Sequence, residues 1–352
     1  MSDQPVHLLS LATAVPERTV AQDAVEETAG ALFVNGARDM FERLRPVYRN
    51  TGIAERRLAA PLDWYLAGHG WRERNRVFVE QGLVLVEEVA LKCLDRAGLT
   101  PDALDAVILV STTGLATPSL DALLAERMGL RRDLVRLPVF GLGCAGGALG
   151  LARGAALARA MPGKRILLVC VELCSLTFRM GELSKTNLIA TALFGDGAAG
   201  AILSTEPGDG LPAIIGAAEH TWRDSLDIMG WRIEEDSFAV TLSRDLPAFV
   251  RANLRPALDG ALEAQGLDLA DFDGIVCHPG GAKVLEALEA SLSQPAGSLD
   301  IERDVLRAYG NMSSPTVLFV LERAVKERLR GGRSLLSALG PGFSAGFVTL
   351  QR

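Results

Sequence analysis

The sequence predicts an α/β fold made of two related halves. Segments 94–108 and 262–276 both read as a helix end, a glycine, a short polar turn and an apolar strand. The same offset of 168 residues places segment 163–168 on segment 331–336, and each of these reads as a helix end followed by a strand. Helices and strands alternate in both halves, which favours an α/β architecture. One offset that recurs along the chain indicates an internal repeat.

The two halves also end alike. Segments 194–202 and 339–347 each place a glycine turn before a final strand of small residues. Between the halves lies the polar segment 204–210, whose turn-forming residues are typical of a boundary. We therefore expect one half at residues 1–206 and the other at residues 207–352.

Composition and charge limit the classes of function. Of the 352 residues, 49% are hydrophobic and 22% are charged, as in an ordinary globular protein, and the net charge of -7 argues against nucleic acid as the main partner. The most apolar run, 166–176, is interrupted by Glu172 and is too short to cross a bilayer. The N-terminus lacks the layout of a secretion signal, so we expect a cytoplasmic protein without a membrane span.

Cys144 is the first candidate for chemistry. Segment 139–148 predicts a strand, a glycine-rich bend and a helix, with this cysteine at the helix start. Free N–H groups and the helix dipole favour a thiolate there, which is the reactive form of cysteine. The alternative is a small buried thiol without a chemical role, the ordinary state of a free cysteine. The chain has five cysteines, an odd number that predicts no disulfide framework.

The same segment also fits a nucleotide-binding pattern. Residues 141–146 read G-x-G-x-x-G, and a later strand ends near Glu172, as in dinucleotide-binding units. Two observations count against this alternative: the motif does not open the first strand–helix–strand unit of the chain, and a cysteine would face the pyrophosphate. No metal-ligand spacing links the histidines to Cys170 and Cys174, so we expect no metal site.

His278 and Asn311 complete a candidate trio. His278 ends an apolar strand before Pro-Gly-Gly, a bend from which it can point into a cleft; the alternative is a core histidine bonded to a backbone carbonyl. Asn311 precedes a helix, where its amide can donate to a carbonyl in a cleft or the residue can cap the helix. The repeat places Cys144 and Asn311 at equivalent helix starts and His278 at a strand end. We therefore expect the three to converge.

Taken together, these segments resemble the chalcone synthase family, the type III polyketide synthases. The resemblance covers nearly the whole chain. It implies the thiolase fold, with two pseudo-twofold-related αβ halves in an α-β-α-β-α layering, and a homodimer. Five motifs carry it in the order that the family has them: GCAGG at Gly143–Gly147, LFGDG at Leu193–Gly197, HPGG at His278–Gly281, GNMSS at Gly310–Ser314 and GPG at Gly340–Gly342.

The family's chemistry gives each member of the trio a role. Cys144 would take an acyl group from coenzyme A. His278 would hold the thiolate and, with Asn311, would bind the thioester carbonyl of malonyl-CoA and stabilise the enolate that remains after loss of carbon dioxide. The enolate would attack the acyl thioester. The resemblance thus implies an acyltransferase that uses acyl-CoA and malonyl-CoA, with no metal or redox cofactor.

Six further residues match pocket positions of the family. Phe194 aligns with a gatekeeper phenylalanine, Val240 replaces a second one, and Trp231 stands where plant chalcone synthases have a glycine. Three positions resemble bacterial members that hold long fatty acyl chains: Thr112, Thr117 and Cys174. The resemblance therefore implies an alkylpyrone or alkylresorcinol as the product of a long fatty acyl starter.

Two points stay open in the sequence. The related β-ketoacyl-carrier-protein synthases III share the Cys-His-Asn logic, so a single condensation with an acyl carrier protein is the alternative activity. The lysines that bind coenzyme A phosphates in plant enzymes are not clearly matched, and we interpret Arg56 and Arg57 as surface or ion-paired residues.

Overall fold

The strands of the two halves join in a single sheet. The computed structural model describes residues 4–33, 38–179, 182 and 184–352. Nine strands pair in the order β11-β12-β13-β8-β1-β7-β6-β4-β5. Five belong to the first half: β1 (Val6–Ala14), β4 (Ala106–Ser111), β5 (Val135–Phe140), β6 (Ile166–Leu173) and β7 (Asp196–Ser204). Four belong to the second: β8 (Ala213–Thr221), β11 (Gly274–Cys277), β12 (Arg333–Gly340) and β13 (Ser344–Gln351).

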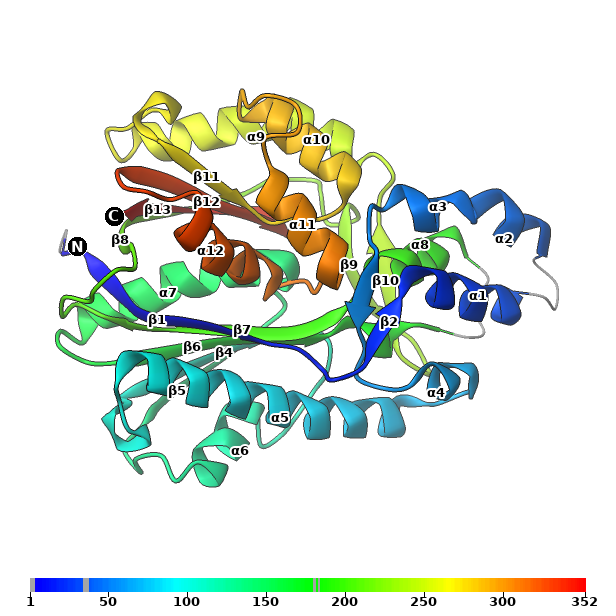
Figure 1. Ribbon diagram of the computed structural model, residues 1–352, viewed down its shortest axis with the longest axis horizontal. Helices are drawn as coiled ribbons and strands as arrows, with labels where there is room; N and C mark the ends of the chain where they lie inside the picture. The colour runs from blue at the N-terminus through cyan, green and yellow to red at the C-terminus, as the bar shows by residue number, and fades with distance from the viewer. Residues whose placement is uncertain (1–3, 34–37, 180–181, 183) are drawn as a thin grey trace.

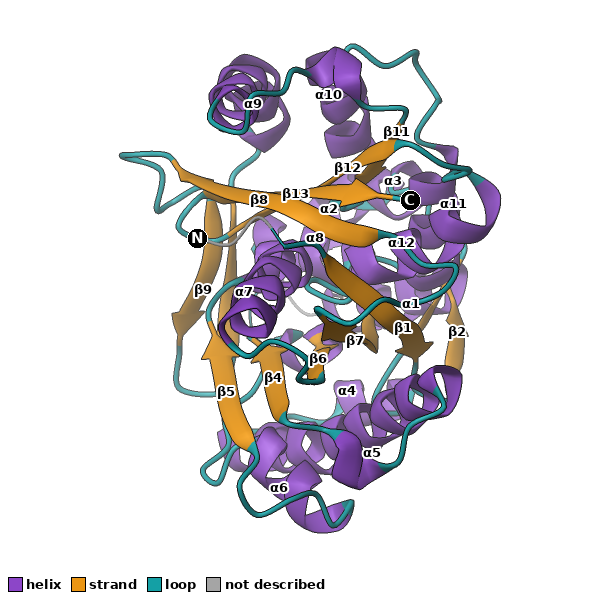
Figure 2. Cartoon of the chain, turned by 90° about the vertical axis from the view of Figure 1, so that its left-hand side faces the viewer, coloured by secondary structure: helices purple, strands orange, loops and turns teal. Residues whose placement is uncertain are grey.

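Helices lie on both faces of each half-sheet and between them, so that the layers run α-β-α-β-α (Figure 1). The halves meet through β1 and β8, which pair antiparallel at two positions only. In Figure 2, α7 lies between the strands of the two halves. This is the thiolase fold that the sequence predicts. The central layer holds α7 (Gly146–Ala160) and α12 (Thr316–Glu327), and the outer helices are α5 (Trp71–Ala97), α6 (Leu120–Arg127), α9 (Leu246–Glu263) and α10 (Ala282–Ser291). The helix α11 (Asp300–Tyr309) packs against α12 and contributes Ile301 and Val305 to the central core.

The internal repeat is visible in the strand order. Read from the junction outward, β1, β7, β6 and β4 correspond to β8, β13, β12 and β11. β4 and β11 begin at equivalent residues of the repeat, and each follows a short 3-10 turn, Pro101–Ala103 and Leu269–Asp271. The correspondence fails at β5, because the equivalent segment of the second half is the helix α11. The linker 205–212 joins β7 to β8.

The two central helices approach each other closely at their N-terminal ends. A Cβ atom on Gly147 would lie 2.5 Å from both the carbonyl oxygen of Ser314 and a methyl carbon of Val317. Only glycine fits at this position, since real Cβ atoms do not come so near to other heavy atoms. Strands of both halves bury apolar side chains against this helix pair, Leu168 from one and Leu336 from the other. The core thus fixes the two helix starts relative to each other.

A smaller region covers one end of the layers, on the right of Figure 1. It contains two small antiparallel sheets, β2 (Thr19–Ala21) with β3 (Glu55–Arg57) and β9 (Met229–Ile233) with β10 (Phe238–Leu242). Its helices are α1 (Gln22–Phe33), α2 (Arg38–Leu44), α3 (Pro46–Asn50), α4 (Leu62–Leu66) and α8 (Lys185–Leu193). Within the described residues, no helix combines the length and the apolar character that a bilayer crossing needs.

Candidate active site

Cys144 lies in the turn that connects β5 to α7. The 3-10 turn Gly143–Ala145 leads directly into the helix, and the cysteine is 6% exposed. Gly143 adopts a φ of +47°, and a Cβ there would lie 2.6 Å from Pro341, so this turn requires glycine. The backbone N–H of Gly143 donates to the Thr112 hydroxyl at 3.0 Å. The Thr112 side chain therefore fixes the turn that carries the thiol.

Asn311 is fixed through its backbone and reaches Cys144 with its side chain. Its N–H donates to the carbonyl of Leu193 at 3.0 Å, and its carbonyl accepts from Gly195 at 3.0 Å. The side-chain Oδ1 accepts the N–H of Ser313 at 2.8 Å, while Nδ2 donates to the carbonyl of Gly280 at 3.3 Å and lies 4.0 Å from the Cys144 sulfur. The side-chain oxygen of Asn311 thus accepts a backbone N–H, as that of a helix-capping residue does. The side-chain nitrogen still directs an N–H toward the thiol.

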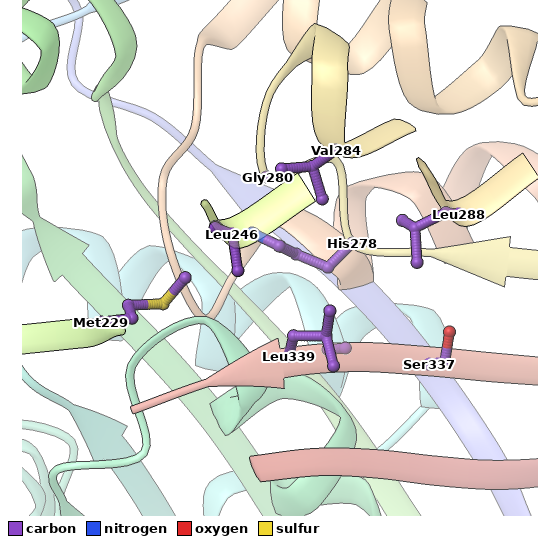
Figure 3. A pocket seen from close by; sticks show the side chains of 9 residues that line it. Met229, Leu246, His278, Gly280, Val284, Leu288, Ser337 and Leu339 are labelled. Carbon is purple, nitrogen blue, oxygen red and sulfur yellow. The ribbon is translucent and has the colours of Figure 1, made fainter. Parts of the chain in front are cut away.

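His278 directly follows β11, and its backbone N–H donates to the backbone carbonyl of Ser337 at 2.9 Å. Its side chain is 5% exposed, and neither ring nitrogen has a hydrogen-bond partner in the described part of the chain. Figure 3 shows the imidazole among Leu246, Val284 and Leu339. The alternative of a core histidine bonded to a backbone carbonyl is therefore wrong. Buried polar groups are normally paired, so two orphaned nitrogens indicate a functional group.

Burial sets the protonation of both groups. It raises the pKa of the Cys144 thiol to about 11, although hydrogen bonds from Ser313 and Asn311 act in the opposite direction. It lowers the pKa of His278 to about 3. Burial of both groups opposes the thiolate that the helix start favours, and the thiolate expected from the sequence stays a prediction.

We expect alkylation of Cys144 by iodoacetamide to accelerate with pH. Because the pKa lies near 11, the thiolate fraction should rise about tenfold per pH unit from pH 7 to 10. Stopped-time labelling with mass detection of the Cys144 peptide measures this rate. A rate that levels off below pH 8 would show that the thiolate is already formed.

A cavity of about 550 Å³ connects Cys144 to the surface. Cys144 and Asn311 both line it, and most other side chains along it are apolar. Three exposed cationic residues also line it: Lys185, Arg244 and Lys283. A chamber of about 20 Å³ beside it contains His278 and shares four lining residues with it: Met229, Leu246, Gly280 and Val284.

Three of the six predicted pocket residues line this cavity. Phe194 and Trp231 face each other with ring centroids 6.1 Å apart, and Val240 is the strand partner of Trp231 in the β9–β10 hairpin. The hairpin is tied down by Trp71, whose indole N–H donates to the carbonyl of Glu234 at 2.6 Å. Phe194 also forms a backbone bridge with Asn311, which connects this part of the lining to the candidate trio.

The other three are placed elsewhere by the structure. Thr112 is buried beneath the Cys144 turn, where its hydroxyl accepts from Gly143. Cys174 is fully buried and packs in a cluster with Phe194. Thr117 is exposed, in the loop between β4 and α6. None of the three contributes to the lining of the described cavity.

Sequence reasoning missed two buried charged residues. The Glu172 carboxylate accepts bonds from the N–H of Thr112 at 2.9 Å, from Thr113 at 2.8 Å and from Ser314 at 2.9 Å, and burial raises its pKa to about 7. These bonds occupy the Glu172 carboxylate, which a dinucleotide site would need to bind the ribose. The dinucleotide-binding alternative therefore fails. The sequence signal for Glu172 was a carboxylate inside an otherwise apolar strand.

The second missed residue is Arg56, whose side chain is 0% exposed. The interpretation of Arg56 as a surface or ion-paired residue was therefore wrong.

The arrangement is suited to acyl transfer. A buried thiol can accept an acyl group, an imidazole without a hydrogen-bond partner among the described residues lines the neighbouring chamber, and the amide nitrogen of Asn311 lies 4.0 Å from the sulfur. An apolar cavity that opens to the surface between cations suits an acyl thioester with an anionic carrier. The fold and site therefore define the class of carbon–carbon condensing acyltransferases.

Known proteins place the chain more narrowly. The family model described as chalcone and stilbene synthases, N-terminal domain, matches residues 67–207, and the C-terminal domain model of the same family matches residues 215–349. The chain is 40% identical to the 1,3,6,8-tetrahydroxynaphthalene synthase of Streptomyces peucetius subsp. caesius, over 99% of this chain and 94% of that protein. The chain belongs to the chalcone and stilbene synthase family.

Solved structures agree with this assignment. The 1,3,6,8-tetrahydroxynaphthalene synthase of Streptomyces coelicolor A3(2), a bacterial type III polyketide synthase, superposes with a TM-score of 0.92 at 28% identity, covering 98% of each chain. PKS-I of the brown alga Ectocarpus siliculosus gives a TM-score of 0.90 at 26% identity, over 99% of this chain and 98% of that one. The protein is a type III polyketide synthase, an acyltransferase that condenses malonyl-CoA. The family match favours it over the single-condensation alternative.

Proposed function

We propose that this polyketide synthase extends a long-chain fatty acyl-CoA with malonyl-CoA and releases alkylpyrones or alkylresorcinols. The observation that supports this starter most directly is the largely apolar cavity of about 550 Å³ that Cys144 lines. A fatty acyl chain gains free energy in such a cavity because its methylene groups leave water. The three cations along the cavity suit the phosphates of the coenzyme A carrier.

The proposed mechanism uses the trio in two half-reactions. In the first, a ring nitrogen of His278 takes the proton of Cys144, the sulfur attacks the acyl-CoA thioester, and the coenzyme A thiolate leaves with a proton. In the second, the amide N–H of Asn311 donates to the thioester oxygen of malonyl-CoA, and the carbon–carboxylate bond breaks to give carbon dioxide and an enolate. The enolate carbon attacks the acyl-Cys144 thioester, the sulfur leaves, and the chain on coenzyme A is two carbons longer.

A second product deserves a test because of the 40% identical relative. 1,3,6,8-Tetrahydroxynaphthalene has ten ring carbons, which correspond to five two-carbon units and need no fatty starter. The likeness to the Streptomyces peucetius protein therefore makes condensation of malonyl-CoA alone the second candidate activity for this chain. Both products can arise from the trio described above, because they differ in the starter and in the number of extensions.

Product analysis separates these candidates. The purified protein is incubated with malonyl-CoA alone and with malonyl-CoA plus acyl-CoA of graded chain length, and the products are identified by mass spectrometry. We expect alkylated products whose mass follows the starter, with turnover highest for long chains. A tetrahydroxynaphthalene from malonyl-CoA alone, together with indifference to fatty acyl-CoA, would overturn the proposed starter and keep the enzyme class. Absence of any condensation would overturn the function as a whole.

We also propose that the protein is a cytoplasmic homodimer that pairs along the β5 edge of the sheet. β5 is the last strand of the sheet and leaves apolar side chains in solvent: Val135 is 41%, Leu137 40% and Phe140 54% exposed. Exposed edge strands of this kind are normally covered by a partner. Sedimentation should give the mass of two chains, and Leu137→Asp should shift it toward one. A wild-type protein that sediments as a single chain would contradict the dimer.

A further inference from the structure

We propose that Arg56 is a positioning residue that holds Asn311 and Phe194 in place for the reaction. The inference rests on the proposed roles of Cys144 and Asn311. Arg56 does not line the cavity, so it would act only through the segments that it binds.

The guanidinium of Arg56 binds three backbone carbonyls at the end of α8. One terminal nitrogen donates to the carbonyls of Thr191 and Phe194, each at 2.7 Å, and the other donates to Ala192 at 2.7 Å. The second nitrogen also binds the side-chain oxygen of Gln22. The last carbonyls of a helix have no partners within the helix and carry the negative end of its dipole, so a cation is favoured there.

The segment that Arg56 binds is the one that positions Asn311. Asn311 donates to the carbonyl of Leu193 and accepts from the N–H of Gly195, so Phe194 lies between the two bonds. The carbonyl of Phe194 itself faces Arg56. A Cβ on Gly195 would lie 2.3 Å from the carbonyl of Tyr309, which shows how little space separates the two segments. A shift of residues 191–195 would therefore move both the gate ring and the amide donor.

The charge state of Arg56 argues against an incidental role. Its side chain is fully buried, and every acceptor that the structure gives its terminal nitrogens is an uncharged oxygen. Burial lowers its pKa to about 10, so the group remains charged at neutral pH. Burying a charge is costly unless its hydrogen bonds are satisfied. Lysine cannot reproduce the arrangement, because a single ammonium lacks the planar fork that reaches several carbonyls at once.

Arg56→Lys should separate two activities of the same site. We expect the kcat of malonyl-CoA decarboxylation, read as carbon dioxide release, to fall at least about tenfold, because small misplacements of a catalytic donor have effects of that size or more. The rate of Cys144 alkylation by iodoacetamide should fall much less than decarboxylation, since alkylation needs no donor on a substrate oxygen and Asn311 acts on it only through the pKa of the thiol. The thermal unfolding midpoint is measured on the same samples.

Arg74→Lys is the matched control. Arg74 is also buried and also binds carbonyls, those of His69 and Leu176 at 2.7 Å each, but it has no contact with residues 191–195. We expect this variant to retain decarboxylation. Equal losses in Arg56→Lys and Arg74→Lys, or a parallel loss of alkylation and decarboxylation in Arg56→Lys, would overturn the positioning role.

Two further arms keep the outcomes distinct. If Arg56→Lys does not fold, Gln22→Leu removes one acceptor of the guanidinium and leaves its three carbonyl bonds. It also removes the amide that donates to the carbonyls of Ala192 and Tyr48 and to the Thr51 hydroxyl. That variant should show the same split between decarboxylation and alkylation at smaller size, and unchanged decarboxylation would overturn the inference. A wild-type enzyme that fails to decarboxylate malonyl-CoA would overturn the proposed function, whereas active wild-type enzyme with an active Arg56→Lys variant would overturn the positioning role alone.

Discussion

Replacing Cys144 by alanine is expected to abolish condensation. Cys144 carries the only thiol that the described cavity exposes to a substrate, so no other cysteine in it can take the acyl chain. Loss of a covalent nucleophile removes a whole reaction path, and we expect product formation to fall by at least ~10³-fold. Mass spectrometry of products from acyl-CoA and malonyl-CoA measures the effect.

Cys170→Ala provides the control for this change. Cys170 is also fully buried, and its sulfur lies 3.9 Å from the carbonyl of Gly146 in the helix that follows Cys144. It has no access to the cavity, so its removal should cost some stability and little activity. Product formation by Cys144→Ala near the wild-type rate would remove this residue as the nucleophile.

Asn311→Asp is expected to lower malonyl-CoA decarboxylation by ~10²–10³-fold, the range found when one oxyanion donor is removed. The substitution keeps an oxygen for the N–H of Ser313 and removes the N–H group that faces Gly280 and the thiol. The hydrogen bond from the N–H of Ser313 should therefore be kept, while the N–H donor of the side chain is lost. Carbon dioxide release at saturating malonyl-CoA reports the donor, and acylation of Cys144 by acyl-CoA reports the rest of the site.

Asn187→Asp tests whether any asparagine-to-aspartate change has this effect. Asn187 is buried in α8 and its amide donates to the carbonyls of Arg179 and Glu182, away from Cys144. We expect reduced stability with decarboxylation kept. Full decarboxylation by Asn311→Asp would show that the amide does not stabilise the enolate.

The layered fold and the meeting of Cys144 with Asn311 were predictable because they follow from local patterns. The glycine stop and polar turn before β4 recur before β11, and both helix starts follow glycine-rich bends. Glycine at 143 and 147 is required by close contacts that a motif can signal. The backbone pairing of Phe194 with Asn311 brings the LFGDG and GNMSS motifs together. The sequence shows the order of these motifs along the chain but not that they are in contact.

Other properties of the site depend on packing that no local pattern encodes. The isolation of His278 arises from side chains on α9, α10 and β12, and that isolation sets its pKa. Arg56 lies in a three-residue strand, and its burial depends on α8, which is far away in the sequence. A resemblance to bacterial members of the family at Thr112 and Thr117 does not establish that a side chain reaches this cavity. The division at residue 206 and the product remain predictions.

Identification of the acylated residue tests the central claim most directly. The protein is incubated with a long-chain acyl-CoA without malonyl-CoA, digested, and the peptides are analysed by mass spectrometry. The account predicts one acyl group per chain, on Cys144, that disappears when malonyl-CoA is added and product forms. An acyl group on another cysteine, or condensation that proceeds without any acyl-Cys144 species, would contradict it.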